Sequence, residues 1–368
     1  MLQKLTSTAP FVLECGEILP EITIAYHTYG TLNSRKDNVV WVFHPLTGNT
    51  EAADWWKGLI GEGKILDPAD YFIVCANMLG SCYGATNADS VNPSTGKTYG
   101  KNFPLITVRD MVRSHQLLQE YLGIQKIYLG IGGSMGGQQL LEWAIIDPAI
   151  FENLVAMATN AQHSPWGIAF NETQRMSLQA DPSLYDNHPE AGRKGLEAAR
   201  AIGMLSYRNE TTYNATQSEQ NDLKLNGFKA ASYQNYQGSK LGNRFSPRAY
   251  LTLSKAMDSH HVGRNRGGVA NALRQIKANT LIIGIQSDIL FPIKEQAELA
   301  KHIPDARFKI IDSIYGHDGF LTENELITAS IDSFLIKKIS KTGGEDNIVN
   351  YSTANQILTT ALPGTERF

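Results

Sequence analysis

The chain has 368 residues, a formal net charge of −3 and three cysteines. This length exceeds the size at which one hydrophobic core usually stops growing, so we expect a core domain with an insertion or a second domain. The small charge, without a dense basic patch, argues against nucleic-acid binding, and the spacing of Cys15, Cys75 and Cys82 fits neither a disulfide framework nor a metal site. With no apolar run of membrane-spanning or signal length, the sequence predicts a soluble, cytoplasmic protein that does not bind membranes.

The first buried strand pattern covers residues 41–43, and the turn 44–49 follows it. Further along, the apolar run 127–131 predicts another buried strand, and apolar residues recur at helical spacing over 140–145. The residues between them read Gly132-Gly133-Ser134-Met135-Gly136, so a serine stands on a sharp strand-to-helix turn. Glycines two positions before and after it are needed because any Cβ would collide with the neighbouring strand and helix. We expect Ser134 to be a nucleophile; the alternative is a glycine-rich turn with an incidental serine.

Strand signals stop after a run over 154–158, and helical patterns replace them. These patterns cover 171–180, 195–205, 249–257 and 265–277. Strands resume at residue 280, so we expect the helical block to be an insertion over the ends of the strands.

Two later strands lead to candidates for the acid and the base. The run 280–285 is followed by Asp288, and the run 308–311 is followed by His317 in a glycine-flanked loop. Folds with such a nucleophile turn place nucleophile, acid and histidine in this chain order. We expect His317 to take the Ser134 proton and Asp288 to orient its imidazole. Asp288 alone could be a turn residue; Asp312 is a rival acid, but it lies only five residues before His317.

Two backbone N–H groups are the expected donors to an oxyanion. One belongs to Met135, directly after the nucleophile, and the other belongs to the loop after the first buried strand, at Leu46. Gly48 lets this loop bend. A plain strand-to-loop turn is the alternative.

These segments resemble the homoserine O-acetyltransferase family, and the likeness covers roughly residues 10–335. The similar stretches are Leu19-Pro20, Ile24-Ala25-Tyr26, Thr28-Tyr29-Gly30, Leu46-Thr47-Gly48, Asp54-Trp55-Trp56, 77–84, 92–96, Phe103-Pro104, 109–112, 132–137, Leu141-Glu142-Trp143-Ala144, 171–175, Ser206-Tyr207-Arg208, Tyr250-Leu251, Ala256-Met257-Asp258 and Gly316-His317-Asp318.

The resemblance implies an α/β-hydrolase fold with a mostly parallel sheet and an inserted helical lid. Its expected boundaries are core 1–162, lid 163–275, core 276–340 and a C-terminal tail 341–368. It also implies ping-pong transfer of an acetyl group from acetyl-CoA, as a co-substrate, to the hydroxyl of L-homoserine, in methionine biosynthesis. Neither a metal nor a tightly bound cofactor is implied.

Homoserine is a zwitterion, and burying either of its charges without a partner costs several kcal/mol. By the resemblance, Arg208 is the carboxylate anchor and Asp318, after the catalytic histidine, is the ammonium partner. Arg175 is a second candidate for the anchor. The alternatives are a surface salt bridge for Arg208 and a loop cap for Asp318.

Three residues depart from the family pattern close to the chemistry. Gln138 replaces an apolar residue, Pro45 a small residue, and Gly319 an alanine. They leave the donor open between acetyl-CoA and succinyl-CoA, and the acceptor open between homoserine and serine. An esterase or thioesterase using water, and a non-catalytic interaction protein on the same fold, also remain as alternatives.

The family is often dimeric through its lid helices. Apolar positions in the helical block that could support an interface are Leu178, Leu196, Leu205, Leu251 and Leu253. We therefore expect a homodimer with small-molecule substrates as its other partners.

Overall fold

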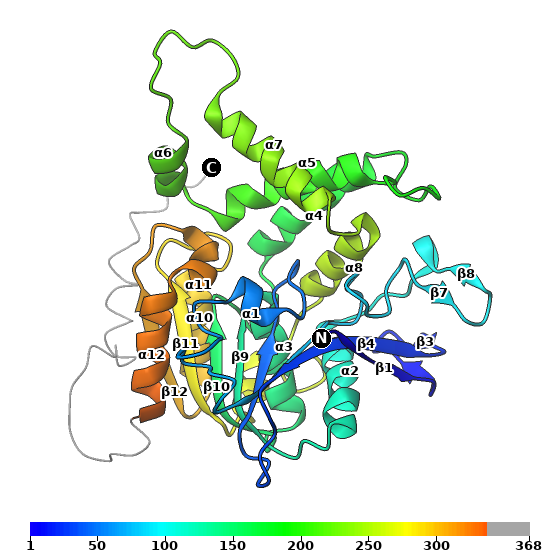
Figure 1. The fold of residues 1–368 in the computed structure, drawn as a ribbon, viewed down its shortest axis with the longest axis vertical. Helices are drawn as coiled ribbons and strands as arrows, with labels where there is room; N and C mark the ends of the chain where they lie inside the picture. The colour runs from blue at the N-terminus through cyan, green and yellow to red at the C-terminus, as the bar shows by residue number, and fades with distance from the viewer. Residues whose placement is uncertain (337–368) are drawn as a thin grey trace.

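The computed structural model describes residues 1–336, and its centre is one eight-stranded sheet (Figure 1). The strand order is β1-β4-β6-β5-β9-β10-β11-β12. The β1–β4 and β4–β6 pairs are antiparallel, and every pair from β6 to β12 is parallel. The strands of this sheet are β1 Gln3–Ser7, β4 Ile22–Tyr29, β5 Val39–Phe43, β6 Phe72–Ala76, β9 Ile127–Gly133, β10 Phe151–Met157, β11 Asn279–Ile285 and β12 Ala306–Ile311.

The predicted strands are confirmed, and so is the mostly parallel α/β-hydrolase sheet. The runs 41–43, 127–131, 154–158, 280–285 and 308–311 fall on β5, β9, β10, β11 and β12. These strands are visible in the sequence because helices cover both faces of a parallel sheet, so their residues are apolar on both sides. Two short hairpins complete the strands, β2 Phe11–Val12 with β3 Ile18–Leu19, and β7 Val91–Asn92 with β8 Lys97–Thr98.

Alternate residues of the strands point into two separate cores. In β5, Trp41 and Phe43 belong to the core under helices α2, α3 and α10, whereas Val40 and Val42 belong to the core under α1 and α12. This is the two-residue period of a strand. The helices around the sheet are α1 Ala52–Trp55, α2 Val108–Tyr121, α3 Met135–Ile146, α10 Ile293–His302, α11 Gly319–Thr322 and α12 Asn324–Ile336, with 3-10 turns η1 Gly100–Asn102 and η2 Gly316–Asp318.

Helices occupy the chain between β10 and β11, and they lie above the carboxyl ends of the parallel strands (Figure 1). They are α4 Pro165–Gln179, α5 Arg193–Tyr207, α6 Glu210–Gln217, α7 Lys229–Gly242, α8 Pro247–Asp258 and α9 Val269–Leu273. The patterns at 171–180, 195–205 and 249–257 correspond to α4, α5 and α8, which are each longer than predicted.

Two details of the helical block differ from the sequence prediction. The helix expected over 265–277 is wrong, because Asn265, Gly267 and Gly268 have φ of 60°, 74° and 96° and only α9 is helical. Helices α6 and α7 were not predicted. The cause for α7 is that it buries only Gly238 and Leu241, so it has no apolar stripe.

The prediction that five leucines support a dimer interface is also wrong for four of them. Leu178, Leu196, Leu251 and Leu253 are buried inside the chain, and only Leu205, 54% exposed, is available to a partner. Within residues 1–336, no helix is both long and apolar enough to cross a bilayer. The predicted tail 341–368 lies outside the described residues.

Candidate active site

Ser134 stands between β9 and α3 in a backbone conformation that side chains rarely adopt, with φ of 55°. The two flanking glycines explain why the turn can be so tight. A Cβ on Gly132 would lie 2.8 Å from the Gly136 backbone, and one on Gly136 would lie 2.2 Å from the Phe43 carbonyl oxygen. Strain of this kind persists only where the surroundings hold it, which is common at active sites.

The end of β10 holds the strained turn in place. The Ser134 N–H donates to the Met157 carbonyl (3.0 Å), and the Thr159 hydroxyl donates to the Ser134 carbonyl (2.8 Å). Both partners are buried. Thr159 therefore positions the serine backbone, a role that its place after a strand does not reveal in the sequence.

His317 and Asp288 lie in contact at the ends of their loops. The His317 Nδ1 is 2.7 Å from the Asp288 Oδ2, and both side chains are nearly inaccessible. The other carboxylate oxygen, Oδ1, accepts the backbone N–H groups of Leu290 (2.8 Å) and Phe291 (2.9 Å). Because an ionised carboxylate only accepts, the proton of the neutral ring sits on Nδ1, and Nε2 is left to take a proton.

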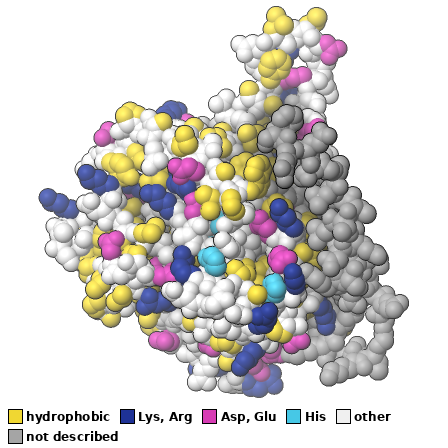
Figure 2. Space-filling model, turned by 180° about the vertical axis from the view of Figure 1, so that it is seen from behind, with side chains coloured by type: hydrophobic (Ala, Val, Ile, Leu, Met, Phe, Trp, Pro, Cys, Tyr) yellow, Lys and Arg dark blue, Asp and Glu magenta, His cyan; other side chains and the backbone are white. Residues whose placement is uncertain are grey.

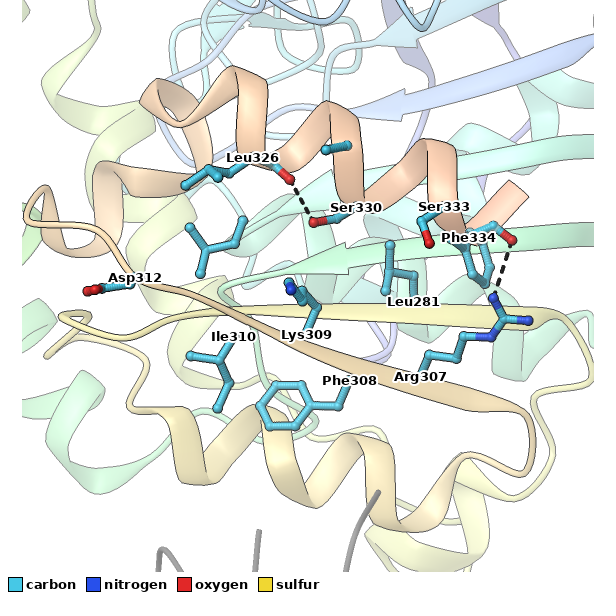
Figure 3. A pocket seen from close by; sticks show the side chains of 12 residues that line it. Leu281, Arg307, Phe308, Lys309, Ile310, Asp312, Leu326, Ser330, Ser333 and Phe334 are labelled. Carbon is cyan, nitrogen blue, oxygen red and sulfur yellow. Dashed lines mark hydrogen bonds between the residues drawn. The ribbon is translucent and has the colours of Figure 1, made fainter. Parts of the chain in front are cut away.

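The rival acid, Asp312, lies elsewhere. It is exposed and lines a cavity of about 530 Å³ between β12 and α12, where Figure 3 shows it at the end of the strand, away from Ser330 and Arg307. The hydrogen bonds in this cavity, from Ser330 to the Leu326 carbonyl and from Arg307 to the Phe334 carbonyl, involve no residue of the predicted triad.

Aromatic rings connect the histidine to the serine turn. The Phe320 ring lies against the turn, because a Cβ on Gly133 would be 2.3 Å from its Cδ2, and its centroid is 5.3 Å from that of His317. Phe291 stacks on the imidazole, with 5.0 Å between the ring centroids and 21° between the ring planes. Tyr207 of α5 is a third neighbour at 6.0 Å. The packing fixes the plane of the imidazole.

A tight turn holds the other expected oxyanion donor. The Gly48 N–H donates to the Pro45 carbonyl (2.8 Å), so the hydrogen bond of the turn uses neither the N–H of Leu46 nor that of Thr47. The His44 Nδ1 donates to the same carbonyl (2.9 Å), while its Nε2 accepts from the Met78 N–H (3.3 Å). Burial lowers the pKa of His44 to about 4, so the ring is neutral, and its hydrogen bonds stabilise the turn. Met135 is the first residue of α3, where N–H groups have no partner inside the helix.

Arg208 and Asp318 lie together beside His317. The Arg208 Nε is 3.0 Å from the Asp318 Oδ2, close enough for an ion pair although the N–H does not point at the carboxylate. The backbones also meet, since a Cβ on Gly316 would lie 2.9 Å from the Arg208 carbonyl carbon. Burial raises the pKa of Asp318 above its usual range, and the charge of Arg208 opposes that rise.

Arg175 does not share this location. Its guanidinium forms ion pairs with Glu172 (2.6 Å) and Asp258, and it also contacts the Ser254 hydroxyl. These contacts join α4 to α8 and leave the residue buried. Arg175 thus stabilises the helical block, and the suggestion that it anchors a substrate has no geometric support.

Two departures from the family pattern have clear surroundings. Gln138 is fully buried, and its Nε2 donates to Asn160 (2.9 Å), whose own amide donates to Glu295 (2.7 Å). Gly319 packs so closely that a Cβ would lie 2.8 Å from the Ile285 Cγ2. Glycine in place of alanine is therefore what this packing accommodates. Among the described residues, no group of three or more His, Cys, Asp or Glu side chains is arranged to hold a metal.

Comparisons with known proteins show the family and agree with the fold. The family described as the alpha/beta hydrolase fold matches residues 38–324. A homoserine O-acetyltransferase of Cyclobacterium marinum is 51% identical over 88% of this chain and 92% of its own length. The crystal structure of esterase E22 has a TM-score of 0.83 at 25% identity, covering 91% of this chain and 100% of that one. That of a homoserine O-acetyltransferase from Bacillus anthracis has the same score at 24% identity, covering 91% and 97%, which shows the fold alone. The chain belongs to the homoserine O-acetyltransferase family, built on the α/β-hydrolase fold.

Proposed function

We propose that the protein transfers an acetyl group from acetyl-CoA to the hydroxyl of L-homoserine, through an acetyl-serine intermediate. The curated relatives that match most of the chain carry the name homoserine O-acetyltransferase, which supports the reaction. The product would be O-acetyl-L-homoserine, an activated intermediate toward methionine. We place the reaction in the cytoplasm, where acyl-CoA is available.

The first half-reaction acetylates the enzyme. The Ser134 hydroxyl gives its proton to Nε2 of His317 as its oxygen attacks the thioester carbon. The oxyanion that forms is stabilised by the N–H groups of Leu46 and Met135. When this intermediate collapses, the carbon–sulfur bond breaks and the imidazolium protonates the departing thiolate of CoA. Asp288 keeps the imidazole in the right tautomer and stabilises its charged form.

The second half-reaction repeats these steps with homoserine. Its hydroxyl gives a proton to His317 and attacks the acetyl carbon, and the oxyanion occupies the same two N–H groups. Collapse breaks the bond to the Ser134 oxygen, which recovers the proton from the imidazolium. Because homoserine must compete with water, the buried aromatic surround of His317 favours transfer over hydrolysis.

The observation that carries the proposal is the ion pair of Arg208 and Asp318 next to His317. An α-amino acid offers a carboxylate to the arginine and an ammonium group to the aspartate, so one ligand can satisfy both charges. A simple esterase has no need of such a pair.

The test is the release of free thiol from acetyl-CoA or succinyl-CoA in the presence of homoserine, of serine, or of no acceptor. Release that depends on acetyl-CoA and homoserine supports the proposal. The fold is also that of esterase E22, so hydrolysis is the second candidate. Equal release without any acceptor would favour hydrolysis, and preference for succinyl-CoA or serine would revise the substrates.

We also propose a homodimer formed through the helical block. Its support is a set of hydrophobic side chains, of which only Leu205 is among the predicted leucines, exposed on helices α4, α5 and α7 and on the α6–α7 loop. They are Trp166, Met176, Leu205, Leu223, Leu225, Phe228 and Tyr236. Figure 2 shows this loop projecting from the body with hydrophobic side chains near its tip. Light scattering at micromolar concentration tests the proposal, and a mass of one chain would overturn it.

A further inference from the structure

A cleft of about 570 Å³ opens between the helical block and the β7–β8 hairpin. Its lining includes Arg193, Arg244, Arg248 and one carboxylate, Asp89. The charge of each arginine matters only as far as a carboxylate does not already compensate it. A positive charge without a carboxylate partner in a cleft attracts anionic ligands.

Two of the three arginines are already paired. Arg193 forms ion pairs with Glu190 and Glu197 on its own helix and just before it. Arg248 pairs with Asp89 (3.1 Å) and also donates to backbone carbonyl groups, which ties it to the structure of the cleft wall.

Arg244 is different. Within residues 1–336 it lies in no ion pair, and its Nη1 donates to two uncharged acceptors, the Thr47 carbonyl (2.8 Å) and the Tyr83 hydroxyl (2.6 Å). The residue is exposed. A guanidinium has five N–H donors in a planar fork, so the Nε and Nη2 side can still bind an oxyanion with two parallel hydrogen bonds.

The contact with Thr47 brings Arg244, at one wall of the cleft, to the oxyanion turn. Thr47 follows Leu46, whose N–H is the expected oxyanion donor, so the guanidinium is hydrogen-bonded to the residue next to that donor. If an acyl donor reaches Ser134 past this turn, the rest of the donor molecule would lie along the cleft.

We propose that this cleft binds the phosphate groups of the acyl-CoA substrate, with Arg244 as their main contact. The inference rests on the proposed function and adds to it the place where the nucleotide end of the donor is held. Phosphate oxygens match the guanidinium fork better than any other group of CoA.

The kinetic test compares two acetyl donors, acetyl-CoA and S-acetyl-N-acetylcysteamine, which has the thioester but no phosphate. In Arg244→Gln we expect the ratio of their kcat/KM values, acetyl-CoA over the phosphate-free donor, to fall by about tenfold or more, the size expected for one charged hydrogen bond. Arg244→Lys should restore part of the ratio. Arg274→Gln, an exposed arginine on the C-terminal end of α9, is the control and should keep the wild-type ratio.

An unchanged ratio would overturn the proposal. This outcome includes a fall in kcat/KM by the same factor for both donors, because Arg244 would then act only by holding the oxyanion turn.

A binding measurement separates this inference from the proposed reaction. Calorimetric titration of CoA into Ser134→Ala should show binding that weakens about tenfold when Arg244→Gln is added, and that weakens with added salt. Equal affinity with and without Arg244 would reject the phosphate site even if acetyl transfer is confirmed. If wild-type enzyme releases no thiol with homoserine while CoA binding still depends on Arg244, the proposed reaction fails and the phosphate site stands.

Discussion

The guanidinium of Arg208 and the carboxylate of Asp318 form an ion pair, with Nε and Oδ2 3.0 Å apart, directly beside His317. The resemblance assigns these two residues to opposite charges of one substrate. In the structure they neutralise each other. When a zwitterion binds, its carboxylate pairs with Arg208 and its ammonium group pairs with Asp318, so two ion pairs replace one. This arrangement keeps both charges compensated in the absence of substrate, which matters because a partly buried charge without a partner is costly.

Replacing Arg208 with alanine should separate the two half-reactions. Acetylation of Ser134 involves only the acyl donor, so the burst of CoA release in pre-steady-state measurements should be nearly unchanged. The value of kcat/KM for homoserine should fall by the equivalent of roughly 2 to 5 kcal/mol, the range for removing one partner of a buried charge pair. Arg208→Lys should recover only part of this loss, because a point charge cannot reproduce the bidentate fork. Equal losses in both half-reactions would mean that Arg208 supports the fold or binds CoA.

Ser134→Ala should lower the rate of acetyl transfer by a factor of roughly 10⁴ to 10⁶, because no other group can take its place as nucleophile. The fold should be retained, since the hydrogen bonds at this position are made by the backbone of residue 134. Thiol release measures the first expectation, and circular dichroism with thermal unfolding measures the second. A variant with more than a tenth of wild-type activity would show that the nucleophile is another residue.

Asp288→Asn should lower kcat by a factor of about 10⁴. This is the loss seen when a triad acid is replaced by its amide and the histidine tautomer is reversed. The matched control is Asp312→Asn. That residue is exposed in the cavity between β12 and α12, and it should keep wild-type kinetics. A larger loss in Asp312→Asn than in Asp288→Asn would reverse the assignment of the acid.

Acid should destabilise the protein through its buried histidines. Burial lowers the pKa of His115 to about 3, and the pKa values of His44, His163 and His260 are lowered to about 4, 4 and 3. Below the usual histidine pKa, near 6.5, the unfolded chain binds protons that the folded chain excludes, so the free energy of unfolding falls as pH drops from about 6.5 toward 4.

His115→Gln removes one such site, and the amide can still contact Gln139. The slope of unfolding free energy against pH should then become smaller by up to about 1.4 kcal/mol per pH unit, the value for one proton. Urea denaturation between pH 7.5 and 4.5 measures it. His188→Gln, on an exposed loop, serves as the control with the wild-type slope. An unchanged slope in His115→Gln would mean that this ring is protonated in the folded state.

The sequence by itself determined five of the eight strands of the central sheet and the order of the candidate triad. Strands buried on both faces have continuous apolar runs, so β5, β9, β10, β11 and β12 were recognisable from these runs, whereas β1, β4 and β6 were not identified. The glycines around Ser134 were equally informative, because their requirement is local and steric. The candidate acid and base followed from their positions after strands, which meet at one edge of a parallel sheet.

Only the tertiary structure decided which polar groups meet. Three contacting pairs are far apart along the chain, and no sequence periodicity predicts their contacts: Arg208 with Asp318, Arg244 with Thr47, and Thr159 with Ser134.

The helical block was predicted least well for a related reason. Helix α7 is mostly polar and lies on α5 through Gly238, whose Cβ would meet the Glu197 carbonyl oxygen at 2.6 Å, so its position depends on close backbone approach and not on an apolar stripe. Buried leucines and surface leucines likewise look the same in sequence, because burial depends on what packs against them in three dimensions.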